Sequence, residues 1–166
     1  MPDLVIRPVQ PEEDAEALAA IYAHYVAHSV ATFDFEAPSV MATREKFEVI
    51  LGKGHPAIAG VIDGRLIGYA YVSDYRPRMG YRYTCEDSIY LAPEACGHGY
   101  GALMLGDVIG KARTFGFKQM LAVIAGSEAA SIGLHKKFGF ETKGTFSSLG
   151  HKFGRWIDVV HMQKAL

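Results

Sequence analysis

The stretch PEACGHGYGALML, residues 93–105, places Gly97, Gly99 and Gly101 at alternate positions directly before an apolar run with helical spacing. Because glycine has no Cβ atom, such a loop can turn sharply and direct several backbone N–H groups at one anion. The positive end of the following helix dipole would add to that attraction. The loop therefore predicts a site for a phosphate or a pyrophosphate.

The same loop permits two other interpretations. The spacing Gly97-x-Gly99-x-x-Ala102 fits the dinucleotide fingerprint, which normally follows the first strand of its sheet and is followed by an acidic residue about 20 positions later. Here 96 residues precede Gly97, and residues 115–119 contain no acid, so we disfavour this interpretation. A glycine-rich turn that only starts a helix stays open on the loop alone.

The strand predicted before this loop, YTCEDSIYL, carries a candidate general base, Glu86. Burial in the sheet would raise the pKa of this carboxyl from about 4.3 toward the range that a base needs near neutral pH. The alternative is a structural ion pair with Arg76, Arg78 or Arg82. Strand alternation defines two faces: Tyr83, Cys85, Asp87 and Ile89 on one, and Thr84, Glu86, Ser88 and Tyr90 on the other.

His135 and Cys96 are two further residues with chemical potential. His135 lies in a predicted helix, SEAASIGLHKKFGF, where Ile132 and Phe138 form the expected buried stripe, and both a structural and a proton-transfer role are open. The seven histidines show no paired spacing of metal ligands, so we expect no metal site. Cys96 lacks the sequence context of an activated nucleophile, and we expect no covalent catalysis.

The elements that position these residues alternate between strands and helices. Asp63-Gly64 is typical of a tight hairpin, Pro11 and the acids after it suit a helix start, and Gly116 suits a helix end. We expect one mixed α/β unit over residues 1–166. Strands are predicted at 3–9, 57–62, 66–72, 83–91, 120–125, 139–150 and 156–163, and helices at 11–30, 39–51, from the glycine loop to Gly116, and 128–138.

Composition limits the possible partners. A formal charge of -1 and a pI near 6.6 provide no basic field for nucleic acid or anionic lipid, so an anion must be bound locally. Two cysteines and the lack of a charged-then-apolar leader predict a reducing, cytoplasmic location. The sequence contains no uncharged run of 18 apolar residues, so we expect no membrane-spanning helix.

Together, the polar-faced strand, the GHGYG loop and the segment AASIGLHKKFGF resemble the GCN5-related N-acetyltransferase (GNAT) superfamily over nearly the whole chain. The tail GHKFGRWIDVVHMQ, with FDFEAP and YRYTCEDSIYL, is similar to the phosphinothricin and methionine sulfoximine/sulfone acetyltransferase branch. This tail is more specific than the glycine loop. The resemblance implies a central, mixed, mostly antiparallel twisted sheet flanked by helices.

The resemblance also implies that the bound anion is the pyrophosphate of acetyl-CoA. The pantetheine arm would lie like an added strand against the strand before the loop, and an N–H near Leu91 would polarise the thioester carbonyl. Cys96 stands where the family usually has Gln or Arg, and Glu128 stands where an Asn is common, so Glu128 could weaken cofactor affinity. The implied cofactor-binding residues are Ile89, Tyr90, Leu91, Cys96, Gly97, His98, Gly99, Tyr100, Gly101, Ala102 and Glu128.

The chemistry implied by the resemblance is direct attack of a free amine on the thioester. Glu86 matches the base of the branch, acting directly or through water, and His135 occupies the position of the acid or proton relay for the departing thiolate. Guanidinium groups beside an aromatic wall suit an amino-acid substrate with a carboxylate. The implied substrate-pocket residues are Phe33, Arg76, Arg78, Tyr81, Glu86 and Tyr90.

The predicted function is therefore acetyl-CoA-dependent N-acetylation of a small amino-acid-like amine such as phosphinothricin, methionine sulfoximine or methionine sulfone. Acetylation of another small amine or of a protein N-terminus is the alternative within enzymes. A non-catalytic CoA-binding module is the alternative outside them. By resemblance, and from the aromatic content of the chain, we expect a homodimer.

Overall fold

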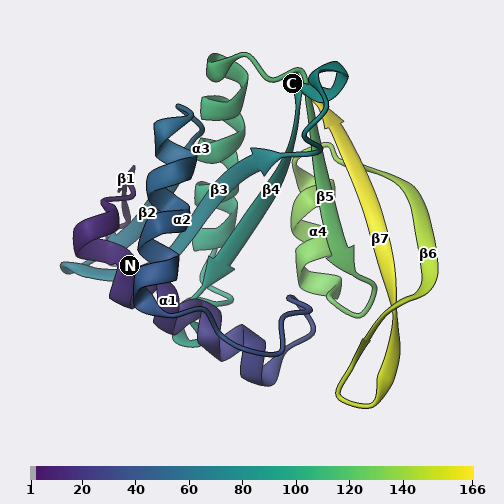
Figure 1. The fold of residues 1–166 in the computed structure, drawn as a ribbon, viewed down its shortest axis with the longest axis horizontal. Helices are drawn as coiled ribbons and strands as arrows, with labels where there is room; N and C mark the ends of the chain where they lie inside the picture. Colours follow the sequence, from purple (N-terminus) through teal and green to yellow (C-terminus); the bar gives the residue numbers. More distant parts are fainter. Residues whose placement is uncertain (1–2) are drawn as a thin grey trace.

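A computed structural model describes residues 3–166, which form one seven-stranded sheet with helices on both faces (Figure 1). The strand order is β1-β2-β3-β4-β5-β7-β6, and every neighbouring pair is antiparallel except β4 and β5. This order of elements and the mixed, mostly antiparallel sheet confirm the fold prediction. The elements are β1 Val5–Pro8, α1 Pro11–His28, α2 Val40–Gly52, β2 Ala57–Ile62, β3 Arg65–Asp74, β4 Thr84–Leu91, α3 Tyr100–Phe115, β5 Gln119–Ala125, α4 Ala129–Lys137, β6 Glu141–Lys152 and β7 Arg155–Ala165, with short 3₁₀ turns at Met79–Tyr81 and Pro93–Ala95.

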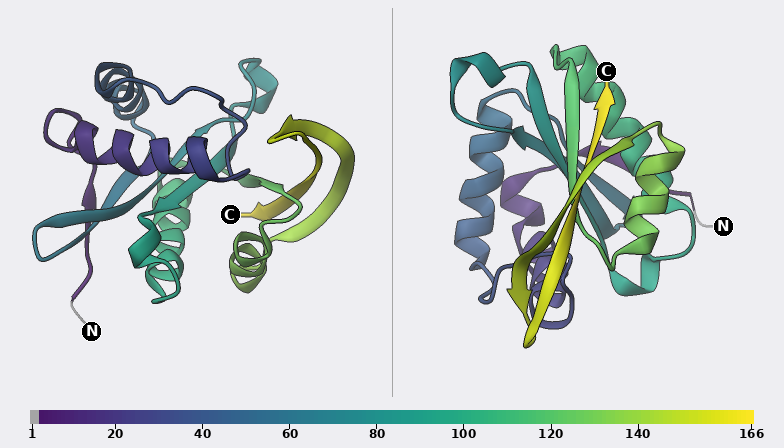
Figure 2. Two further views of the ribbon diagram at one scale, coloured as in Figure 1. Left: turned by 90° about the horizontal axis from the view of Figure 1, so that it is seen from below. Right: turned by 90° about the vertical axis from the view of Figure 1, so that its right-hand side faces the viewer.

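Helices α1 and α2 cover one face of the sheet, and α3 and α4 cover the other (Figure 2). The core on the α3 side contains the fully buried Met104, Leu105 and Val108 of α3 packed against the sheet. The core on the other side joins Leu18 of α1 and Phe47 of α2 to the sheet. Both cores remove large apolar side chains from water, which is the main source of stability for such a layered fold.

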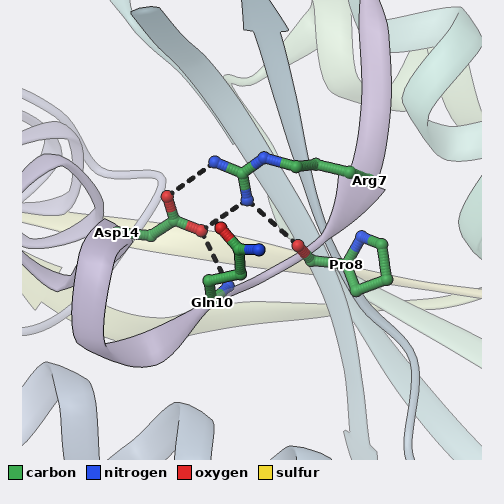
Figure 3. A network of polar contacts seen from close by, with 4 residues as sticks. All are labelled: Arg7, Pro8, Gln10 and Asp14. Carbon is green, nitrogen blue, oxygen red and sulfur yellow. Dashed lines mark hydrogen bonds and ion pairs between the residues drawn. The ribbon is translucent and has the colours of Figure 1, made fainter. Parts of the chain in front are cut away.

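An ion pair between Arg7 and Asp14 connects β1 to the start of α1 (Figure 3). Arg7 donates two hydrogen bonds to Asp14, at 2.7 and 2.8 Å, and the backbone N–H of Gln10 donates to the same carboxylate at 2.8 Å. Burial disfavours the charge on Asp14, but the hydrogen bonds from Arg7 and Gln10 outweigh it and lower its pKa below the ordinary value. The carboxylate therefore serves as the first-turn acid predicted for this helix.

The turn chemistry follows the sequence closely. Asp63 and Gly64 both have positive φ angles, 49° and 78°, as the tight β2–β3 hairpin requires. Gly116 ends α3 in the left-handed region, and its N–H donates to the carbonyls of Ala112 and Arg113. The first strand is shorter than predicted, at four residues.

The predicted buried stripe of α4 needs a correction. His135 is the only α4 residue that is fully buried, at 2% exposure, whereas Ile132 lies only partly buried against the core. Phe138, just past the helix end, is also only partly buried. The histidine, not an apolar side chain, is therefore the centre of the face that α4 presents to the sheet. Within residues 3–166, no helix is long and apolar enough to cross a membrane.

Candidate active site

The sheet opens between β4 and β5. These parallel strands pair only at Thr84–Gln119, Cys85–Met120 and Glu86–Leu121, and beyond Glu86 they diverge toward the lower edge of Figure 1. A cavity of about 520 Å³ lies at this divergence and is lined by residues of both strands, of α4 and of the loop before α3. Glu86 therefore stands at the last paired position, where the cavity begins.

The exposed edge of β4 offers backbone groups to a ligand. The N–H of Ala92 donates to the carbonyl of Ile67, toward the β3 side of the strand, at 2.8 Å. Because backbone groups alternate in direction along a strand, the N–H groups of Ile89 and Leu91 point to the open side. The Leu91 carbonyl on that side already accepts a hydrogen bond from the Tyr25 hydroxyl at 2.6 Å. Two N–H donors thus remain for an added, strand-like ligand.

The glycine loop leads into α3 with its donors free. Gly97 and Gly99 have φ angles of 80° and 85°, a conformation that residues with a Cβ atom rarely adopt. The backbone N–H groups of residues 97–101 donate to no protein acceptor in the part of the chain that the structure describes. Five consecutive unpaired donors at a helix start have a geometry that suits an anion.

Most of the predicted cofactor residues lie together. Tyr100 does not line the cavity, because its side chain is buried in the core beneath α1 and α2 at 6% exposure. His98 stacks on Tyr100 and also lies outside the lining. The exposed Cys96 lines the cavity, with its Sγ 3.6 Å from the carbonyl of Ala92. The predicted cofactor residues that line the cavity are Ile89, Tyr90, Leu91, Cys96, Gly97, Gly99, Gly101, Ala102 and Glu128.

Glu86 has the environment of a base. Burial, and then the nearby charge of Asp87, raise the pKa of the Glu86 carboxyl above its ordinary value. Among the described residues, its carboxylate forms no ion pair with Arg76, Arg78 or Arg82, the structural alternative considered above. A partly buried carboxyl group with a raised pKa at the mouth of the β4–β5 opening is a candidate proton acceptor.

Asp87 and His135 form a buried pair on the opposite face of β4. The Nε2 of His135 lies 2.8 Å from Oδ2 of Asp87, and its Nδ1 lies 2.7 Å from the carbonyl oxygen of Ser131. Burial disfavours the imidazolium, but the hydrogen bond and charge of Asp87 outweigh it and raise the pKa of His135 above its ordinary value. Oδ1 of Asp87 is buried and has no hydrogen-bond partner among residues 3–166. This pair can hold a proton beside the cavity, which both residues line.

Asp87 did not emerge as a functional residue from sequence. Strand alternation correctly placed it on the same face as Cys85, and both residues are buried. Its position could have indicated a role, because a carboxylate among apolar residues on a buried face requires a buried partner.

Three predicted substrate residues lie outside the cavity. Arg76, Arg78 and Tyr81 are exposed in the loop between β3 and β4, and none lines the cavity. Tyr75 packs edge-on against Tyr81, with ring centroids 5.3 Å apart, and the Arg76 guanidinium lies 5.2 Å from the centroid of the Tyr75 ring.

Two predicted aromatic residues occupy different places. Tyr90 lines the cavity and packs edge-on against Tyr22 at 5.3 Å. Phe33 is 38% exposed and lies against Gly150 rather than in the lining. Its neighbours Ala31 and Thr32, which the sequence did not indicate, do line the cavity.

Comparison with known proteins identifies this architecture. Residues 6–161 match the family model described as Acetyltransferase (GNAT) domain. The chain belongs to the GNAT acetyltransferase family. A phosphinothricin N-acetyltransferase of Alcaligenes faecalis is 42% identical over 93% of this chain and 79% of its own length. An L-methionine sulfoximine/L-methionine sulfone acetyltransferase of Pseudomonas aeruginosa is 38% identical over 90% of this chain and 88% of its own.

A solved structure supports the same placement. The phosphinothricin acetyltransferase of Sinorhizobium meliloti, crystallised in complex with acetyl-CoA, superposes with a TM-score of 0.95 at 40% identity, covering 98% of this chain and 88% of that one. This GNAT protein is thus an acetyl-CoA-dependent N-acetyltransferase of the branch that contains those relatives. Its free loop amides, open β4 edge and adjoining cavity fit a long ligand with a diphosphate and a strand-like arm.

Proposed function

We propose that this enzyme acetylates the α-amino group of a small amino-acid-like substrate, with phosphinothricin, methionine sulfoximine and methionine sulfone as the candidate acceptors. The observation that carries the proposal is the position of Glu86. Its carboxyl group, with a raised pKa, lies where β4 and β5 diverge, beside the free edge that would hold the thioester arm. The similarity to the two curated relatives supports the choice of acceptors.

The glycine loop binds the diphosphate of acetyl-CoA through the N–H groups of residues 97–101. The N–H groups of Ile89 and Leu91 pair with the pantetheine arm, and the Leu91 N–H stabilises negative charge on the thioester oxygen. Glu128 places a carboxylate in the same cavity, and its charge reduces affinity for the polyanionic cofactor.

Proton transfer requires groups on both faces of β4. An α-ammonium group has a pKa of about 8, so only about a tenth of the substrate is the free amine at pH 7. Glu86 removes a proton from the bound ammonium, either directly or through a water molecule, so that the free amine can attack the acetyl carbon. The carbon–sulfur bond then breaks, and His135, held by Asp87, gives a proton to the thiolate. The nitrogen loses its second proton as the amide forms, and this proton replaces the one that His135 gave.

Several of the residues that hold the acceptor lie outside the cavity lining. The β3–β4 loop leaves β3 at Asp74, one residue beyond Ser73, the residue that pairs with Glu86. Arg76 and Arg78 on this loop offer guanidinium groups to the substrate carboxylate, while Tyr81 and Phe33 provide aromatic surface. An amino-acid zwitterion so oriented directs its amine toward Glu86.

We further propose that the enzyme is a homodimer that buries exposed apolar side chains of the β6–β7 hairpin. This hairpin ends the sheet, and β6 is an edge strand. It exposes Phe146, Leu149, Phe153 and Trp156, with Trp156 70% exposed. An apolar edge of this kind favours pairing with a second copy. Light scattering coupled to size-exclusion chromatography would measure twice the mass of 18.1 kDa, and Trp156→Glu would return the monomer.

A panel of amines in a CoA-release assay tests the acceptor assignment. Phosphinothricin, methionine sulfoximine and methionine sulfone should give kcat/KM values at least about a hundredfold above those of unmodified amino acids or N-terminal peptides. Activity confined to peptides would refute the small-molecule assignment. Binding of acetyl-CoA without acetylation of any amine would refute the catalytic proposal.

A further inference from the structure

Lys152 is a buried charged residue that does not line the cavity. Its exposure is 1%, although lysine is almost never fully buried without partners. Its Nζ donates hydrogen bonds to the backbone carbonyls of Ser29 and Thr32, each at 2.7 Å, and lies 5.1 Å from the centroid of the Phe153 ring. Lys152 on β6 is thus bonded to the segment that follows α1, more than 100 residues earlier in the chain.

Gly150, two residues earlier on β6, contacts the same segment. A Cβ atom built on Gly150 would lie 2.3 Å from Cε2 and 2.4 Å from Cζ of Phe33, so the aromatic ring rests directly on bare backbone. Residues 150 and 152 point to the same side of the strand, as the period of two requires. Both lie in the GHKFG motif of the tail.

Residues 29–34, here called the 29–34 segment, lie beside the β6–β7 hairpin (Figure 2) and reach the cavity. Ala31 and Thr32 of this segment line the cavity together with Glu86 and Tyr90.

The segment is also fastened to α1 through Tyr22. The Tyr22 hydroxyl lies 2.7 Å from Oγ1 of Thr32 and donates to Asp34 at 2.5 Å. Tyr22 in turn packs against Tyr90, which shares the face of Glu86 on β4. The segment therefore has two attachments, one to α1 and one to β6, and the second consists of Lys152 and Gly150.

We propose that Lys152 and Gly150 are positioning residues for the acceptor amine: they fix the 29–34 segment so that Ala31, Thr32 and Phe33 form one wall of the acceptor site. This inference rests on the proposed function and gives the GHKFG motif a role in substrate positioning. The ammonium donates hydrogen bonds to the carbonyls of Ser29 and Thr32, and the missing Cβ of Gly150 makes room for the Phe33 ring. Neither residue lies on the glycine loop or on the β4 edge, so cofactor binding does not depend on them.

Two substitutions act on the two attachments separately. Lys152→Met keeps the length of the side chain but leaves the carbonyls of Ser29 and Thr32 without a donor, and Gly150→Ala forces the Phe33 ring to move. Because an unsatisfied buried polar group is costly, each variant should raise the KM for the amine at least about tenfold, with the affinity for acetyl-CoA unchanged within about twofold. A simple loss of stability would not separate these two constants.

Matched controls exist on the same strand. Lys143→Met removes an exposed lysine, and Gly144→Ala adds a Cβ atom where no atom lies within 4 Å. Both controls should leave the amine KM within about twofold of the wild type. In a Phe33→Ala background, Gly150→Ala should have no further effect, because the ring that it displaces is gone.

The measurements are steady-state kinetics for the amine and calorimetry for acetyl-CoA, on full-length protein whose thermal unfolding has been recorded. A normal amine KM in both folded variants would overturn the inference while leaving the proposed function intact. Equal losses for amine and acetyl-CoA would also overturn it. If the wild type acetylates no amine of the panel, the proposed function fails and this inference fails with it. If Lys152→Met does not fold, Gly150→Ala decides.

Discussion

Replacing Glu86 with glutamine removes the proposed base while keeping the size and shape of the side chain. General-base catalysis contributes about 10² to 10⁴ in rate, and we expect the turnover of Glu86→Gln at pH 7 to fall about 10²- to 10³-fold. The loop amides and the β4 edge are untouched, so acetyl-CoA affinity should stay within about twofold. Calorimetry and a CoA-release assay measure the two quantities on the same protein.

The pH dependence makes this prediction specific. Burial raises the pKa of Glu86, so the wild-type kcat/KM should rise with pH through a value above the ordinary 4.5 and then level off. The variant lacks the rise in kcat/KM that depends on ionisation of Glu86. Because the free fraction of an amine with a pKa of about 8 grows from about 0.1 at pH 7 to about 0.9 at pH 9, the deficit of the variant should shrink by about tenfold over that range.

Glu141→Gln provides the matched control, since Glu141 is an exposed glutamate that pairs only with Lys143 among the described residues. It should leave turnover unchanged. A Glu86→Gln enzyme as fast as the parent at pH 7 would refute the assignment of the base. A deficit of the same size at every pH from 6 to 9 would refute proton abstraction and assign Glu86 to substrate binding.

Three further predictions concern other parts of the molecule. Gly99→Ala should weaken acetyl-CoA binding about tenfold, because alanine at a φ of 85° costs about 1–2 kcal/mol and displaces the loop. Gly110→Ala, inside the following helix α3 and with open space around it, should leave the affinity measured by calorimetry unchanged. Asp87→Asn should lower the pKa of His135 in an NMR titration relative to the wild type, because burial of the ring persists while the stabilising carboxylate is lost, and an unchanged pKa would contradict the pairing. Asp14→Asn should reduce the free energy of unfolding by about 2 kcal/mol at pH 7; since the pKa of Asp14 is lowered by folding, this loss should be complete above about pH 4 and vanish as the pH falls through the folded-state pKa, in denaturant titrations at several pH values.

The fold could be predicted from the sequence because its signals are local. Asp63-Gly64, Gly116 and the alternation of β4 each determine backbone geometry within a few residues, and the structure confirms them. The glycine loop was equally accessible, because the left-handed conformations of Gly97 and Gly99 follow from the residue type. The burial of α4 was predicted less well, since a histidine replaces the apolar residue that a periodic stripe requires.

The site was only partly predictable, because its remaining parts depend on distant contacts. Asp87 bonds to His135, 48 residues later, and Lys152 bonds to carbonyls 120 and 123 residues earlier, so neither role can be recognised from the local sequence. Every residue has a backbone carbonyl, so the residue types do not show which carbonyls Lys152 binds. The contact of Phe33 with Gly150 is hidden for the same reason, because a glycine within a strand indicates a close approach without naming the partner.

The proposed catalytic groups lie on a strand, whereas the proposed acceptor-binding residues lie on loops, and this difference bears on how acceptor specificity can change. Glu86 and the donors Ile89 and Leu91 share β4, whose geometry is held by β3 along its whole length, so the distance between base and thioester site is fixed by the rise of one strand. The acceptor wall instead comes from the 29–34 segment and the β3–β4 loop, which are attached at a few points. Substitutions at those attachments should therefore change which amine is accepted, while the proton-transfer chemistry on β4 persists.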